Sequence, residues 1–75
     1  MSTKRAEKNK MINYEKLREL RQKLGFTQQQ VADSIGVARH VYCRKERGLM
    51  AISLAEAYII SKKFYFSIEE IFFTE

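Results

Sequence analysis

The 75-residue chain has no proline and no tryptophan, and it has only three glycines and one cysteine. The lack of proline suits a chain built from helices, because proline interrupts them. A single cysteine cannot form a disulfide within the chain, which is consistent with a reducing compartment. No stretch approaches the roughly 20 apolar residues that span a bilayer, and the polar N-terminus has no apolar signal-peptide region. We therefore expect a cytoplasmic protein with no membrane partner.

The sequence also lacks the residue groupings of an enzyme. It shows no carboxylate pair, no phosphate-binding loop and no nucleophile with a base and an orienting group. His40 and Cys43 form the one His–Cys pair, but a metal site needs three or four ligands and the chain has no second His or Cys. We expect no catalytic activity, no metal and no cofactor.

Positive charge is concentrated in the first two-thirds of the chain. Residues 1–47 carry twelve Lys and Arg against five Asp and Glu, whereas residues 48–75 carry two against four. A polyanion would therefore meet the first part. Residues 1–12 are a basic tail, in which residues 1–10 contain almost nothing apolar. They form either a solvated tail or an arm that follows phosphates or enters a minor groove, and the sequence leaves both open.

Apolar residues recur at helical spacing through the rest of the chain, and no segment alternates as a strand does. Three capping boxes, each a Thr or Ser followed three residues later by Gln or Glu, open at Thr27, Ser53 and Ser67. The fold class is therefore all-α, a compact five-helix bundle that fills residues 13–75. The five helices are expected over about 13–24, 27–35, 38–47, 53–64 and 67–73. On the fourth, Leu54, Ala57, Tyr58 and either Ile60 or Ser61 are expected to face inward.

The second and third helices predict a helix-turn-helix. Gly36 supplies the positive φ of the corner between them, and Gly48 ends the third helix. The outward side of that third helix carries Arg39, His40, Cys43 and Arg44. Such a helix fits a DNA major groove, where arginine can donate two hydrogen bonds to guanine. The interpretation that one arginine contacts a phosphate instead stays open.

Three segments carry a family resemblance: LRELRQKLGFTQQQVADSIGV, RKERG, and SLAEAYIISKKF with SIEEIFF. On these the chain resembles the Xre-type, Cro/phage-repressor family of helix-turn-helix proteins. The resemblance spans about residues 14–73. It implies a lambda-repressor-like DNA-binding domain, in most members a dimeric transcriptional repressor.

The resemblance and the residue chemistry together assign roles. Arg21 and Glu46 match a partly buried structural ion pair, and Gln28 matches a glutamine that contacts phosphate and braces the recognition helix. The expected base contacts are Ala38, Arg39, His40, Cys43 and Arg44. The expected phosphate contacts are Gln28, Thr27, Gln29, Arg47 and Gly48, the last two through backbone amides.

The chain departs from the family pattern at several positions. Ala38 stands where a capping Ser or Thr is common, and Tyr65 stands where a glycine commonly ends the helix. Tyr42 replaces a small aliphatic residue, and Lys45 replaces an apolar one. The loop 49–52 is apolar where relatives carry Lys, Arg or Pro.

The function these features predict is a DNA-binding repressor. It would act as a homodimer on a short palindromic operator in double-stranded DNA, with helix 38–47 in the major groove. The dimer contact is expected at Ile68, Phe72 and Phe73, although the same side chains could all be core. The alternative is an antitoxin-like or protein-interaction module that holds a protein partner through the 49–52 loop or the C-terminal helix.

Overall fold

The computed structural model describes residues 12–73, and within that range it contains five helices and no strand. The helices are α2 (Tyr14–Lys23), α3 (Gln28–Ile35), α4 (Arg39–Glu46), α5 (Leu54–Phe64) and α6 (Ile68–Phe72). Each lies within its predicted range, so the all-α prediction is confirmed. The predicted basic tail, apart from residue 12, lies outside the described residues.

The helix starts follow from local side-chain chemistry. Thr27, Ser53 and Ser67 each accept a hydrogen bond from the backbone N–H three residues on, and the Gln or Glu at that position returns one. Asn13 caps α2 by accepting from the N–H of Lys16 at 2.9 Å. Ala38 offers no side-chain bond to α4. Four of the five helices are therefore capped by side chains.

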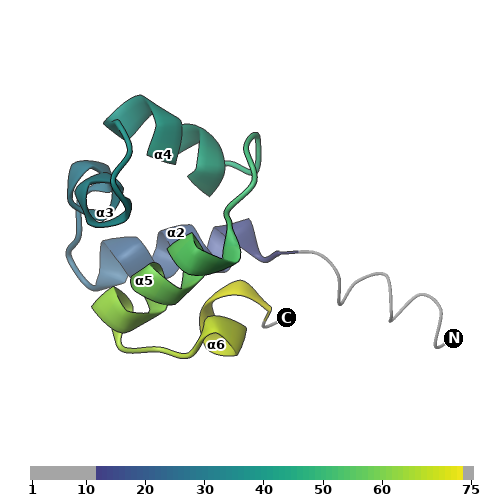
Figure 1. The fold of residues 1–75 in the computed structure, drawn as a ribbon. Coiled ribbons are helices and arrows are strands. Elements are labelled where there is room, and N and C mark those ends of the chain that lie inside the picture. Colours follow the sequence, from purple (N-terminus) through teal and green to yellow (C-terminus); the bar gives the residue numbers. More distant parts are fainter. Residues whose placement is uncertain (1–11, 74–75) are drawn as a thin grey trace, which may run out of the picture.

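The helices enclose one core, to which all five contribute. In Figure 1, α4 lies at the top with α3 beside it, and α5 and α6 lie below. α3 packs against both α4 and α5, while α2 packs against α4 and α6. The N–H of Asn13 donates to the carbonyl of Phe72 at 2.6 Å, which ties the two ends of the described chain together. The buried apolar residues are Leu17, Leu20, Val31, Ala32, Tyr42, Ala57, Ile60, Phe64, Ile71 and Phe72.

The inner face of α5 differs in part from the expectation. Ala57 and Ile60 are buried as predicted, but Leu54 is 77% and Tyr58 55% exposed. The buried stripe continues through Ser61 and Phe64 instead. Ile60, Ser61 and Phe64 lie three, four and seven residues after Ala57, on the same side of the helix. Tyr58 comes directly after Ala57, so its side chain is rotated away from that buried side. None of the helices between residues 12 and 73 is long and apolar enough to cross a membrane.

Candidate nucleic-acid interface

The corner between α3 and α4 has the geometry of a helix-turn-helix. Gly36 adopts a left-handed conformation with φ 75°, which a residue with a Cβ resists. The next N–H, that of Val37, donates back to the carbonyl of Ala32 at 3.0 Å. This bond satisfies a carbonyl at the end of α3 and turns the chain directly into α4.

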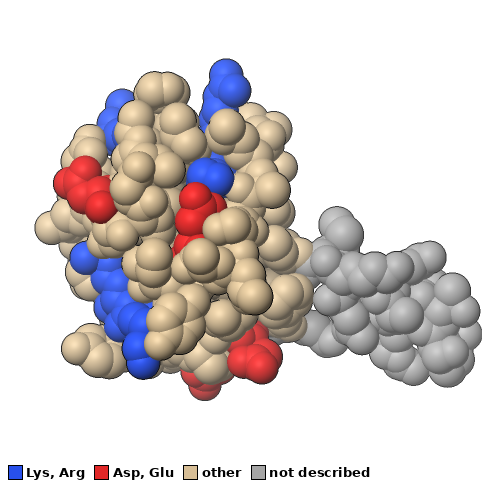
Figure 2. All heavy atoms as spheres, viewed as in Figure 1, with Lys and Arg blue, Asp and Glu red and all other residues tan. Residues whose placement is uncertain are grey.

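α4 has one buried side and one exposed side. Tyr42 is fully buried and Glu46 is 1% exposed. Figure 2 shows basic side chains projecting at the top of the molecule, where Figure 1 places α4. The predicted base contacts Ala38, Arg39, His40 and Arg44 are exposed, and Cys43 is half-buried. The exposed side is therefore basic and open to a ligand. No group of three or more His, Cys, Asp and Glu that could hold a metal occurs among residues 12–73.

The predicted ion pair between Arg21 and Glu46 is present. The guanidinium donates from Nε to Oε2 at 2.5 Å and from Nη2 to Oε1 at 3.3 Å. Its Nη1 donates to the carbonyl of Phe26 at 2.9 Å. Both side chains are more than nine-tenths covered. This pair joins α2 to the C-terminal end of α4 and fixes where the exposed helix stands on the bundle.

The Glu46 carboxylate has two further partners. Tyr42 donates its hydroxyl to Oε2 at 3.1 Å, and Gln28 donates its amide N–H to Oε1 at 2.8 Å. The amide oxygen of Gln28 accepts in turn from Nη1 of Arg39 at 3.3 Å. A continuous chain of hydrogen bonds therefore runs from the buried carboxylate to an exposed arginine on α4. The bracing role of Gln28 stays a prediction, and these bonds are the contacts through which it would act.

The sequence marks Tyr42 only as a departure from the family pattern. Its spacing of four from Glu46 on one helix is the signal for a contact between them. Burial, followed by the charge and the hydrogen bond of Glu46, raises the pKa of Tyr42 well above the ordinary tyrosine range, although Arg21 acts in the opposite direction. The phenol therefore stays protonated and donates.

The N-terminus of α3 opens into a hollow of about 560 Å³ that Arg39 also lines. The first N–H groups of a helix have no acceptor inside it. The capping box occupies that of Gln30, which leaves those of Gln28 and Gln29 for an outside acceptor. The dipole and the outward N–H groups of a helix start suit a phosphate. The side-chain amide of Gln29 donates one of its two N–H groups to Asp33 at 2.8 Å.

The other predicted phosphate site, at the end of α4, differs from the expectation. The N–H of Arg47 donates to Cys43 at 3.1 Å, and the N–H of Gly48 donates to Lys45 at 3.1 Å. Both amides therefore close the last turn of the helix instead of facing a ligand. The exposed guanidinium of Arg47 is the group this end offers to a phosphate.

The predicted dimer residues divide in the structure. Phe72 is 1% exposed and belongs to the core, so the expectation that it contacts a second subunit is wrong. The short α6 directs this ring inward against the bundle, where the apolar surface of a small domain is needed most. Ile68 packs partly against the core, and Phe73 is 46% exposed.

Comparison with known proteins agrees with this geometry. A family model described as helix-turn-helix matches residues 17–71. The chain belongs to the helix-turn-helix family. The resemblance noted in the sequence is thereby confirmed at the level of the family.

Two relatives are similar over most of their length. One, from Bacillus subtilis (strain 168), is named "uncharacterized HTH-type transcriptional regulator YgzD"; it is 33% identical over 60 residues, covering 80% of this chain and 91% of its own. The other, an "uncharacterized HTH-type transcriptional regulator" from Archaeoglobus fulgidus, is 39% identical over 57 residues, covering 76% of this chain and 81% of its own. No solved structure gives a significant match.

Proposed function

We propose that this helix-turn-helix protein is a transcriptional repressor that binds a short palindromic DNA operator as a homodimer. Membership of the family and the names of both relatives support a DNA-binding regulator. The observation that carries base readout is the placement of Arg39 and Arg44. Both are exposed on a helix whose opposite side is fixed by Tyr42 and Glu46.

The surroundings of α4 support a groove-bound orientation. A recognition helix enters a major groove only if neighbouring groups hold the DNA backbone in register. The start of α3 offers outward N–H groups, and the end of α4 offers Arg47. In this proposal phosphates bind at both places, and Arg39 and Arg44 meet base edges between them.

The test compares selected with random DNA. Duplexes are selected from a randomised pool by the wild-type protein, and binding is measured over a salt series. Arg39→Ala and Arg44→Ala are each expected to lose about 1–3 kcal/mol of discrimination against a changed base pair. Lys23→Ala is the matched loss of charge, because that residue lies on the side of α2 with Lys16 and Glu19. It is expected to change affinity little and to leave base preference intact. Base readout is refuted if both arginine variants weaken binding to every duplex by the same factor.

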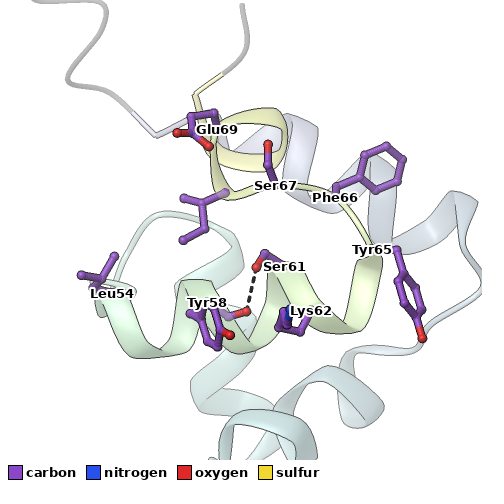
Figure 3. A pocket seen from close by; sticks show the side chains of 9 residues that line it. Leu54, Tyr58, Ser61, Lys62, Tyr65, Phe66, Ser67 and Glu69 are labelled. Carbon is purple, nitrogen blue, oxygen red and sulfur yellow. Dashed lines mark hydrogen bonds between the residues drawn. The ribbon is translucent and has the colours of Figure 1, made fainter.

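The second copy of the dimer is proposed to bind along α5. Figure 3 shows the groove between α5 and α6, with Leu54, Tyr58 and Tyr65 around it. Tyr65 is 93% exposed, and Leu54 and Tyr58 are more than half exposed. The groove also carries Lys62 and Glu69. Opposite charges on one patch suit a two-fold contact, in which each patch meets its own copy.

Sedimentation equilibrium tests the dimer. The wild type is expected to be dimeric at the concentrations that saturate operator, with half-sites about 34 Å apart. Tyr58→Lys is expected to produce a folded monomer that binds one half-site more weakly. Phe73→Lys tests the exposed residue of the dimer contact that the sequence predicts on α6. If the second copy binds along α5, this variant is expected to stay dimeric. A wild type that stays monomeric when bound to a palindrome contradicts the dimer.

Repression is the proposed regulatory sign, because the family that the sequence resembles consists mostly of repressors. Transcription in vitro from a promoter carrying the selected site measures it. The alternative, an antitoxin-like or protein-interaction module, is favoured by one observation: Leu49 is 65% and Met50 39% exposed in the loop after α4. That alternative predicts no salt-dependent DNA binding, so the same titrations separate the two functions.

A further inference from the structure

One buried residue of this interface has a role that the family resemblance does not supply. Tyr42 stands where a small aliphatic residue is usual, and its hydroxyl reaches Oε2 of Glu46 at 3.1 Å. An aliphatic side chain would fill the core without that bond. The effect of the added hydroxyl can be followed atom by atom to the exposed surface.

The first step is the orientation of the carboxylate. Oε2 of Glu46 accepts from both Tyr42 and Arg21, while Oε1 accepts from Gln28 at 2.8 Å and from Nη2 of Arg21 at 3.3 Å. The guanidinium donates to both oxygens and the hydroxyl adds a second bond to Oε2, so these bonds together set the rotation of the group. Oε1 is thereby held toward α3.

The second step is the orientation of an amide. An ionised carboxylate only accepts hydrogen bonds, so Gln28 must present its NH₂ to Glu46 and its oxygen to the other side. That oxygen accepts from Nη1 of Arg39 at 3.3 Å. With the amide reversed, an NH₂ group would face the guanidinium and repel it. The donor and acceptor orientation of the hydrogen bonds from Glu46 through Gln28 to Arg39 therefore depends on how firmly the carboxylate is held.

We propose that Tyr42 is a positioning residue for DNA readout, acting through Glu46 and Gln28 to preorganise the guanidinium of Arg39. This inference rests on the proposed function, because it takes Arg39 to be a base-reading residue. Tyr42 itself is fully buried and does not reach DNA. Through this path the hydroxyl restricts the conformations of the Arg39 side chain in the free protein. Less conformational entropy is then lost when the arginine binds DNA.

The test is Tyr42→Phe, which keeps the ring and removes the hydroxyl. Binding is measured to the highest-affinity selected duplex, to its single-base substitutions and to random DNA. Tyr42→Phe is expected to weaken binding to the selected duplex about three- to tenfold, the range of one hydrogen bond. Random DNA is expected to bind within about twofold of wild type, since phosphate contacts dominate it. The lost preference is expected at the base pair that Arg39→Ala identifies.

Two controls separate positioning from a general loss of stability. Ile71→Val shortens a core side chain on α6, outside the hydrogen-bond chain, and is expected to lower the thermal midpoint while leaving base preference unchanged. In a Gln28→Ala background the hydroxyl has no path to Arg39, so Tyr42→Phe is expected to cause no further loss of preference. Should Tyr42→Phe be partly unfolded, the titrations are repeated in sucrose, which restores the folded population.

The outcomes are distinct. If Arg39→Ala leaves base preference unchanged, base readout by that arginine is wrong and the proposed function fails at that point. If Arg39→Ala removes a preference that Tyr42→Phe keeps, the proposed function stands and the role of Tyr42 is overturned. Equal weakening on all duplexes, or an undiminished effect in the Gln28→Ala background, also overturns it.

Discussion

Lys45 on α4 forms an ion pair with Glu56 on α5, with 3.1 Å between Nζ and Oε1. The same ammonium donates to the carbonyl of Ala51 at 2.7 Å. Glu56 is also the returning half of the capping box that opens α5, accepting from the N–H of Ser53 at 3.0 Å. One lysine therefore connects the proposed recognition helix, the apolar loop and the start of the next helix. Both side chains are largely covered, which limits solvent screening.

The ion pair predicts a loss of stability in Lys45→Met. Methionine keeps most of the packed stem and removes the ammonium, so Glu56 and the carbonyl of Ala51 lose their cation. We expect the free energy of unfolding to fall by about 1 kcal/mol, which lowers the midpoint of a domain this size by about 4–8 °C. Thermal denaturation followed by circular dichroism measures it. A midpoint within 1 °C of wild type would show that the pair contributes nothing measurable.

The pH dependence of the same site follows from its hydrogen bonds. Burial acts to raise the pKa of Glu56, but the Ser53 N–H and Lys45 outweigh it, so the pKa is lowered. A lowered carboxylate pKa stabilises the fold above the unfolded value, about 4.3, and the contribution is lost as the pH falls through the folded value. The free energy of unfolding of wild type is therefore expected to exceed that of Glu56→Gln at neutral pH and to lose this excess below about pH 4.5. Glu19→Gln, at an exposed position on α2, is the control for the loss of a carboxylate elsewhere in the chain.

The sequence predicted the fold well because local signals agreed with one another. The caps at Thr27, Ser53 and Ser67 each fix a helix start within a few residues of chain, so no tertiary information is needed to find them. The Arg21–Glu46 pair came from the family resemblance, since 25 residues separate its members. Which of two neighbouring residues faces inward was harder. The predictions that Tyr58 faces inward and that Phe72 faces a second subunit are wrong. Which side of a helix faces the core depends on the helices that pack against it, and the sequence does not show how these are arranged.

The candidate site shows the same limit. Exposure of Arg39 and Arg44 follows from helical spacing once the buried side is known. The occupied amides of Arg47 and Gly48 depend on how α4 ends, and a helix end is set by backbone angles that many residues tolerate. The bond from Tyr42 to Glu46 and the bond from Lys45 to Glu56 both involve residues that depart from the family pattern. A resemblance shows that the residue at such a position differs from the family pattern, but it does not show which residues the new side chain contacts.

Breaking the buried ion pair is expected to be the most damaging single change. Arg21→Met leaves the Glu46 carboxylate buried without its cation, which costs about 3–5 kcal/mol. For a domain of this size that loss approaches the whole free energy of unfolding. Urea denaturation measures it, with Arg18→Met as the control at an exposed position of the same helix. The double variant Arg21→Met, Glu46→Leu is expected to recover part of the loss, because it removes the uncompensated charge. A loss below about 1 kcal/mol in Arg21→Met would contradict a buried, desolvated pair.

The uncapped start of α4 offers a stabilising change. Ala38 already has the extended backbone of a cap residue, with φ −71° and ψ 155°, but has no side-chain oxygen. Ala38→Ser adds an acceptor for a first-turn N–H and is expected to raise the free energy of unfolding by about 1 kcal/mol. Ala55→Ser is the matched control, because it adds the same hydroxyl to the first turn of α5, which Ser53 already caps. Both are measured without DNA, since residue 38 faces the proposed ligand. A lower midpoint in Ala38→Ser than in Ala55→Ser would contradict the cap geometry.

Tyr65 ends α5 in a left-handed conformation, with φ 63° and ψ 35°, and is the one described non-glycine residue with a positive φ. This conformation costs an L-residue about 1–2 kcal/mol, and the exposed ring regains little of that within its own subunit. Tyr65→Gly is therefore expected to stabilise the dilute monomer by about 0.5–1 kcal/mol, the relief being partly offset by the entropy of glycine in the unfolded chain. Tyr58→Gly, inside the same helix, is expected to destabilise it by about 1 kcal/mol.

At higher concentration Tyr65→Gly is expected to weaken the dimer, because the ring borders the groove proposed for the second copy. A variant that destabilises the dilute monomer would show that the ring's contacts outweigh the backbone strain, and unchanged dimerisation would remove Tyr65 from the interface.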